Sequence, residues 1–166
     1  NGGSEAEIEP GLEPFRKQAE NAAVVYTSLA QLNQLLTRGE VDAAPYYSAR
    51  IWALRKGGAS NIHFVIPEEG GLQLPYMLVV PKGSGNREAV LKWLNYSASA
   101  EPQIKASGIG GYIPVNDNAV LPSDVEGNFG VSVADMKKGA VSVDWLEIAR
   151  QNDKRIELVE KIIAGD

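Results

Sequence analysis

The stretch that decides the fold runs from Gly39 to Asn116 and reads GEVDAAPYYSARIWALRKGGASNIHFVIPEEGGLQLPYMLVVPKGSGNREAVLKWLNYSASAEPQIKASGIGGYIPVN. Apolar runs of strand length alternate in it with segments whose apolar residues recur every three or four positions, which is typical of strands alternating with helices. Glycine and proline separate these segments. Because parallel strands are joined through crossover helices, the alternation predicts an α/β fold with a parallel sheet covered on both faces.

The same pattern extends to both sides of this stretch. Ser28 precedes Gln31 by three residues, the spacing of a capping box that opens a helix. Gly39 can end that helix in the left-handed conformation. We expect strands over residues 23–27, 41–45, 61–66 and 75–82, and helices over 8–20, 28–38, 48–56, after Asn86, after Ser99 and over 142–164. The pattern assigns no structure to residues 117–140.

Composition excludes several classes of protein. The net charge is −5 and lysine and arginine form no cluster, so a nucleic-acid partner is not expected. No apolar run approaches the roughly 20 residues that cross a bilayer. The chain has no cysteine, which excludes disulfides and zinc sites with sulfur ligands. The first residues lack the pattern of a signal peptide, so we expect a mature form or a fragment.

The sequence contains no credible catalytic constellation. The single histidine, His63, lies in the middle of an expected strand, without the second histidine or cysteine that a zinc site needs. The glycines at 83–85 and 108–111 lack the spacing of a nucleotide-binding loop and are expected to be turns. We therefore expect no enzymatic activity, no metal and no cofactor.

Three loops carry the candidate binding residues, because ligands of open α/β sheets gather outside the carboxyl ends of the strands. Ser28 and Ser48 offer hydroxyls and helix-start amides there. Of the adjacent Tyr46 and Tyr47, one is expected to be core and the other, Tyr47, to face a cleft. The third loop runs from Glu68 to Gln73. The alternatives are that Ser28 is only a helix cap, that the tyrosines cover a sheet edge, and that Glu68 and Glu69 are a solvated pair.

Five successive motifs carry a resemblance to a known family: GEVDAA, the aromatic turn, FVIPEEGG, LPYMLVVPKGSGNREAVLKWLNY and GYIPVN. In this order they resemble the second half of a periplasmic solute-binding protein of ABC importers, in the spermidine/putrescine-binding-like group. The likeness covers residues 1–148. It implies a type II fold of two α/β lobes that close on a solute like a Venus flytrap, a periplasmic location and a membrane permease as partner.

The resemblance also implies a division of the chain. Residues 1–72 would form the second lobe, 73–124 would be a crossover strand and helices of the first lobe, and 125–166 would return to the second lobe with the terminal helix. Most of the first lobe would then be absent. An exposed crossover strand would either associate with a missing first-lobe segment or self-associate.

Ser28 and Tyr47 fall where polyamine-binding relatives use a serine and a stacking aromatic residue. After the EGG bend those relatives have a tryptophan and an aspartate, whereas this chain has Leu74 and Tyr76. A buried ammonium without a carboxylate is strongly disfavoured, so a polyamine would require Glu68 or Glu69 as a substitute. The identity of the solute therefore stays open. The full set of expected ligand contacts is Ser28, Tyr46, Tyr47, Ser48, Glu69, Gln73 and Tyr76.

Two other functions stay possible at the level of sequence. Adjacent tyrosines such as Tyr46 and Tyr47 are iron ligands in ferric-binding members of the wider superfamily, although here the pair follows its strand about three residues earlier. The ligand-sensing domain of a transcription regulator has a similar two-lobed fold, but it would need a DNA-binding module that these residues do not supply.

Overall fold

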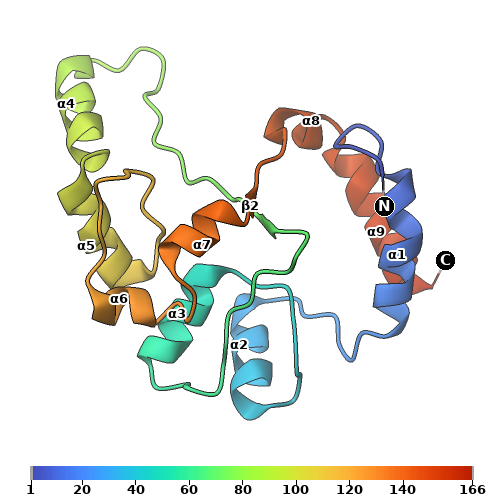
Figure 1. Ribbon diagram of the computed structural model, residues 1–166. Helices are drawn as coiled ribbons and strands as arrows, with labels where there is room; N and C mark the ends of the chain where they lie inside the picture. The colour runs from blue at the N-terminus through green and yellow to red at the C-terminus, as the bar shows by residue number, and fades with distance from the viewer. Residues whose placement is uncertain (1, 166) are drawn as a thin grey trace. The chain divides into compact units, whose positions relative to one another are not determined.

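The computed structural model describes residues 2–165 (Figure 1). Helices dominate it, and its only strands within that range are two short ones. The helices are α1 (Glu9–Glu20), α2 (Leu29–Arg38), α3 (Ser48–Lys56), α4 (Arg87–Ser97), α5 (Ala100–Gly110), α6 (Ser123–Gly127), α7 (Val133–Lys138), α8 (Trp145–Arg150) and α9 (Asn152–Ala164). The strands are β1 (Gly71–Leu72) and β2 (Ala140–Val141). None of the helices within residues 2–165 is long and apolar enough to cross a membrane.

The chain divides into two compact units. The first combines residues 2–32 with residues 142–165, and the second is the continuous stretch 33–141. The formal charge is unequal between them, since lysines and arginines balance aspartates and glutamates within 33–141. The whole net charge of −5 therefore belongs to the sequence outside that stretch, residues 1–32 and 142–166.

In the first unit α1 packs beside α9, although the two helices are far apart in sequence (Figure 1). Polar groups near the start of α1 join them: Lys154 forms an ion pair with Glu9 at 3.2 Å, and the Arg155 guanidinium donates to the Glu5 carbonyl. Glu5 also accepts the backbone amide of Asp144 at 3.1 Å. Ile162 is the buried apolar residue of α9. Hydrogen bonds and burial thus both hold the two ends of the chain together.

The start of α2 confirms one of the two hydrogen bonds of the expected capping box. The Gln31 amide donates to the Ser28 hydroxyl at 3.2 Å, and the Gln31 side chain accepts the Thr27 amide at 2.9 Å. The reciprocal bond therefore goes to Thr27 rather than to Ser28 itself. Gly39 follows the helix with a φ of 69°, the left-handed ending that a glycine adopts without a Cβ penalty.

The second unit has one apolar core built around Trp52. Leu121, Phe129 and Met136 are buried against it, so α3 meets the segment that contains α6 and α7. The Trp52 indole donates to the Val125 carbonyl at 2.8 Å, which satisfies its one buried polar group. Partly buried residues from other segments complete the cluster: Phe64, Ile66, Ile104, Ile113, Val125, Val131 and Val133.

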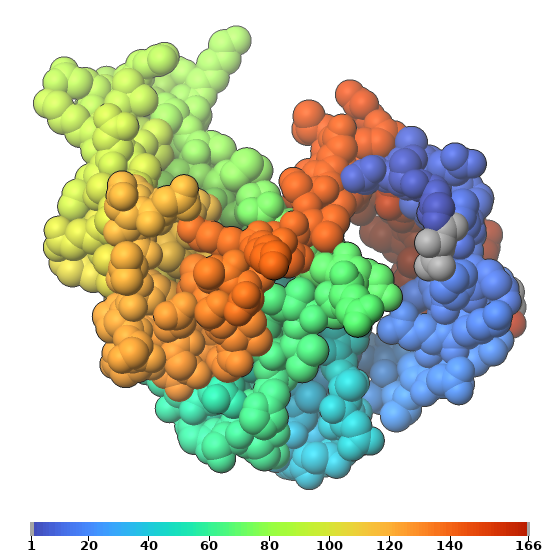
Figure 2. Space-filling view, viewed as in Figure 1, coloured from blue at the N-terminus to red at the C-terminus, as the bar shows by residue number. Residues whose placement is uncertain are grey.

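The two strands pair in parallel, with Gly71 opposite Ala140 and Leu72 opposite Val141. Gly70 precedes β1 with a φ of 95°, and an added Cβ would lie 2.9 Å from the Gly139 carbonyl oxygen. Glycine at this position therefore permits both the turn and the close approach of the strands. Beyond this ladder the chain leads to α4, which forms a tip of the second unit (Figure 2).

The structure corrects all four expected strands. Residues 23–27, 41–45, 61–66 and 75–82 form no ladder within the described range. Their apolar, β-branched composition does predict extended chain, but a strand also needs a hydrogen-bonded neighbour, which sequence pattern does not supply. The helix-rich arrangement with a small parallel sheet is compatible with an α/β domain.

The helix predictions were more accurate. The expected helices near 8–20, 28–38 and 48–56, and those after Asn86 and Ser99, are α1 to α5. The prediction of a single terminal helix over 142–164 was wrong, because the chain is interrupted at Gln151 and forms two helices, α8 and α9. Asp144 caps α8 by accepting the amides of Leu146 and Glu147. Residues 117–140, to which the sequence assigned no structure, contain α6 and α7.

Candidate functional site

The aromatic turn before α3 separates its two tyrosines as the sequence suggested. Tyr46 is partly buried and its hydroxyl donates to the Asn33 side chain at 2.6 Å. Tyr47 is exposed over 46% of its surface and is the N-cap residue of α3. The two ring centroids lie 6.1 Å apart. Ser48 is the first residue of α3, so this turn presents one outward aromatic face beside a helix start.

The bend from Glu68 to Gln73 is held by its backbone. The Gly70 amide donates to the Pro67 carbonyl at 2.9 Å, and the Gln73 amide donates to the Val141 carbonyl at 2.9 Å. Glu69 and Gln73 are both exposed. The backbone of this bend is therefore fixed by β2, while its polar side chains face solvent.

Tyr76 contacts Tyr112, a residue 36 positions later in the chain. The ring centroids are 5.3 Å apart and the rings meet nearly edge to face, at 74°. Both rings are exposed, Tyr76 over 82% of its surface and Tyr112 over 46%. Such a pair offers flat apolar faces together with two phenolic hydroxyls.

Tyr112 is held firmly by groups around it. The fully buried Ser107 hydroxyl lies 2.5 Å from the Tyr112 carbonyl oxygen, to which it donates. A Cβ at Gly110 would lie 2.5 Å from the Tyr112 ring, so only glycine allows this ring position. The following turn is fixed by Gln103, whose side-chain oxygen accepts the amides of Val115 and Asn116. The loop that carries Tyr112 is thus arranged before any ligand arrives.

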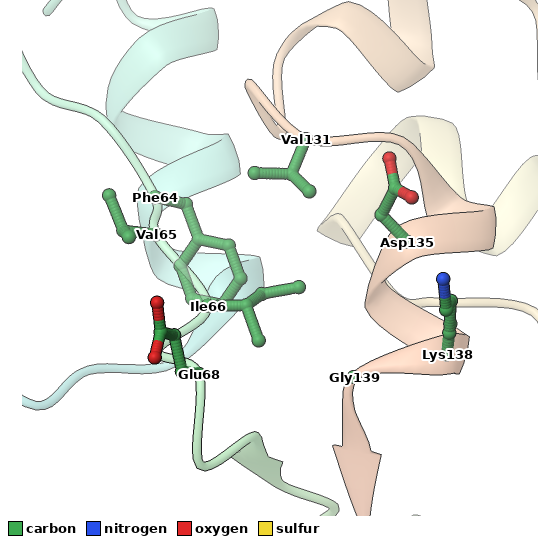
Figure 3. Close-up of a pocket in the computed structure, with 8 residues that line it drawn as sticks. All are labelled: Phe64, Val65, Ile66, Glu68, Val131, Asp135, Lys138 and Gly139. Carbon is green, nitrogen blue, oxygen red and sulfur yellow. The ribbon is translucent and has the colours of Figure 1, made fainter.

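An open depression of about 550 Å³ lies beside the Glu68 bend (Figure 3). Phe64, Ile66 and Val131 supply apolar surface, and the Glu68 carboxylate lies on the opposite side from Asp135 and Lys138. The Asp135 carboxylate accepts the Ser132 hydroxyl at 2.6 Å as part of the cap of α7. This depression therefore combines an apolar floor with charged groups of both signs.

The expected contacts are divided between the two units. Ser28 belongs to the first unit, where it caps α2, and the six others belong to the second. Within the second unit Tyr46, Tyr47 and Ser48 are adjacent, and Tyr76 lies against Tyr112. Sequence reasoning missed Tyr112. Its signal was the GYIPVN motif directly after a glycine-rich helix end, where an aromatic residue follows a turn that glycine makes possible.

Shifted pKa values occur at ion pairs on helix surfaces. The hydrogen bond from Lys105 lowers the pKa of Glu101, and the same contact raises the pKa of Lys105. No group of three or more histidine, aspartate or glutamate side chains within residues 2–165 is arranged to hold a metal ion. The two tyrosine pairs offer aromatic contact and hydrogen bonding.

The family model for bacterial extracellular solute-binding proteins matches residues 4–131. The chain belongs to this family. No curated protein and no solved structure matches it. Membership supports an extracellular solute-binding role in transport, with a small-molecule ligand and an associated transporter, for this solute-binding protein. It also supports a secreted or periplasmic location, and proteins of this kind are generally not enzymes.

Proposed function

We propose that this solute-binding protein captures a small polar organic solute in the periplasm and delivers it to the membrane permease of an ABC importer. The observation that carries the proposal is the exposed pair of Tyr76 and Tyr112 on a backbone fixed by Ser107. Family membership supplies the general role, and this pair supplies a surface suited to it.

The chemistry of the pair favours particular solutes. Tyrosine rings bind the flat or CH-rich faces of ligands, while their hydroxyls accept or donate hydrogen bonds. Neither ring carries the charge that would neutralise an ammonium, and Tyr76 stands where the resemblance implies an aspartate. We therefore expect a solute recognised through a planar or aliphatic face and hydroxyl or carbonyl groups, in preference to a polyamine.

In this proposal the architecture is the two-lobed one of a Venus flytrap. Residues 1–72 and 125–166 belong to one lobe and residues 73–124 to the other; these bounds come from the resemblance and differ from the two compact units, because Leu121 packs against Trp52. Tyr47, Ser48, Glu69 and Gln73 add contacts from loops of the second unit. The solute favours the closed form only through its stronger binding to that form than to the open one.

Binding measurements on matched variants test this function. Thermal-shift screening against amines, amino acids, sugar acids and ferric chelates would first find a solute that stabilises the chain. Titration followed by NMR then compares the wild type with Tyr112→Ala and Tyr112→Phe. Loss of the aromatic contact should weaken binding about tenfold, whereas the phenylalanine variant should keep most of the affinity.

Tyr96→Ala is the matched control, since Tyr96 is an exposed tyrosine on α4 outside the pair. It should leave the affinity unchanged. Equal affinity of the Tyr112→Ala and wild-type chains would contradict the assignment of the pair as the binding surface.

Ferric iron is a second candidate for the bound solute, favoured by the adjacent rings of Tyr46 and Tyr47. Addition of ferric citrate would give a visible phenolate-to-iron absorption band if both oxygens bind the metal. A colourless sample would remove this candidate, and the hydrogen bond from the Tyr46 hydroxyl to Asn33 already competes with it.

A further inference from the structure

Lys56, the last residue of α3, contacts both Trp52 and the end of α5. Its ammonium nitrogen lies 4.5 Å from the centroid of the Trp52 ring and donates to the Gly108 carbonyl at 2.8 Å. A cation over an indole face is attracted by the ring quadrupole, and a charged donor makes a stronger hydrogen bond than a neutral one. One side chain therefore joins the apolar core of the second unit to the last turn of a neighbouring helix.

The end of α5 has no cation of its own. Its last turn, residues 107–110, reads SGIG and contains no basic residue. The last four carbonyls of a helix lack intrahelical partners and carry its negative dipole end. The Gly111 amide satisfies one of them, the Ser107 carbonyl, at 2.8 Å. Lys56, 52 positions before Gly108 in the chain, satisfies a second one and brings the positive charge that the dipole favours.

The direction in which the chain leaves α5 determines where the Tyr112 ring lies. Gly111 packs against the Trp52 side chain, and Tyr112 follows it directly. Lys56 fixes the last turn of α5, and Trp52 limits the position of Gly111. Because both contacts come from α3, this helix sets the position of the Tyr112 backbone. The contact of the Tyr112 ring with Tyr76, at a centroid distance of 5.3 Å, therefore depends on α3.

We propose that Lys56 is a positioning residue of the solute-binding surface, which holds Tyr112 in place through the end of α5. This inference rests on the proposed function, in which Tyr76 and Tyr112 contact the solute. Ser107 and Gln103 belong to α5 itself and fix the turn after it locally. Lys56 has a different effect, because it ties α5 to the core around which the second unit is built.

Fluorine NMR of the full chain labelled with 3-fluorotyrosine tests the proposal without a solute. The chain has six tyrosines, and the variants Tyr76→Phe and Tyr112→Phe assign the two resonances of the pair. Lys56→Met keeps an unbranched apolar stem but removes the charge and the donor, so it should shift both resonances. Lys56→Arg restores a charged donor that stacks on aromatic rings, and it should return both resonances towards their wild-type positions.

Lys105→Met is the matched control, because Lys105 lies on α5 itself and pairs with Glu101 of the same helix. It removes the same charge and should leave the tyrosine resonances unchanged. Amide hydrogen exchange provides a second measurement. Lys56→Met should speed exchange of the Gly111 amide about three- to tenfold, because the end of α5 loses a hydrogen bond. Exchange of the Met136 amide, in the same core but on α7, should not change.

Three results would overturn the proposal: unmoved resonances in Lys56→Met, equal shifts in Lys56→Met and Lys105→Met, or equal acceleration of exchange at Gly111 and Met136. The last of these would mean a general loss of stability. Failure of the proposed function gives a different result, because Tyr112→Ala would then keep the wild-type affinity for the solute found by thermal-shift screening. Shifted resonances in Lys56→Met would still support the positioning role in that case.

Discussion

Gly111 lies against the side chain of Trp52, and a Cβ added to it would come within 2.8 Å of the indole. Gly111 also ends α5 in the left-handed conformation, with a φ of 68°. Trp52 is exposed over only 2% of its surface and is fixed by its hydrogen bond to Val125, so it cannot move away. Two independent constraints therefore require glycine at this position.

Gly111→Ala should lower the free energy of unfolding by about 2 to 4 kcal/mol, from the left-handed penalty together with overpacking against the indole. Urea denaturation followed by circular dichroism measures this change. Gly127→Ala is the control, because an added Cβ there meets nothing within 4 Å. It should be neutral or slightly stabilising. Similar losses in the two variants would show that Trp52 does not impose the constraint.

Ser107→Ala should destabilise the second unit and loosen Tyr112. The buried hydroxyl lies within hydrogen-bonding distance of the carbonyls of Gln103 and Tyr112, and its removal leaves the Tyr112 carbonyl without this donor. We expect a loss of about 1 to 2 kcal/mol in urea denaturation. The near-ultraviolet circular dichroism of the tyrosines should also weaken. Ser60→Ala, at an exposed position, should change neither signal.

Local rules predicted the helices but not the sheet. The capping box at Ser28 and the glycine at Gly39 act within a few residues, so the sequence alone locates α2. A ladder joins distant segments, as between Gly71 and Ala140, and apolar composition does not identify such a partner. The runs at 41–45 and 61–66 were therefore assigned as strands although they form none within the described residues.

The candidate site shows the same division between local and distant effects. The different exposure of Tyr46 and Tyr47 followed from the opposite directions of adjacent side chains. The contact between Tyr76 and Tyr112 depends on how α5 returns the chain to the segment that carries Tyr76, which no short motif records. The break at Gln151 was missed because the apolar stripe continues across it, while Asp144 caps only the first of the two helices.

Substitution of Ser28 separates its role as a helix cap from a role in solute binding. Ser28→Ala should cost about 1 kcal/mol of stability, because the Gln31 amide loses its acceptor. Ser28→Asn keeps a good cap and should retain stability. If Ser28 contacts the solute, as the resemblance implies, the asparagine variant should still bind more weakly in titrations. Unchanged affinity in Ser28→Asn would restrict the residue to capping.

Acid should weaken the packing of α1 against α9. A hydrogen bond from its own backbone amide, and then the contact with Lys154, lower the pKa of Glu9 below its ordinary value of 4.5. A lowered pKa in the folded state stabilises the protein above the unfolded pKa, and this contribution is lost as the pH falls through the folded pKa. The wild type should thus be slightly more stable than Glu9→Gln at neutral pH.

Thermal melts at a series of pH values measure this difference, which should disappear in acid. Glu13→Gln is a suitable comparison, because Glu13 pairs with Lys17 in the same helix rather than with α9. A stability difference for Glu9→Gln that persists at low pH would contradict the assigned contribution.

The packing of α1 beside α9 closes a loop that contains the whole of the second unit. Bringing together ends so far apart has an entropic cost that grows with the length of flexible chain between them. Compaction of residues 33–141 shortens that flexible length, so the Trp52 core should form early and the terminal helices should dock late. Hydrogen exchange should accordingly open the α1 and α9 pair at lower free energy than the core of the second unit.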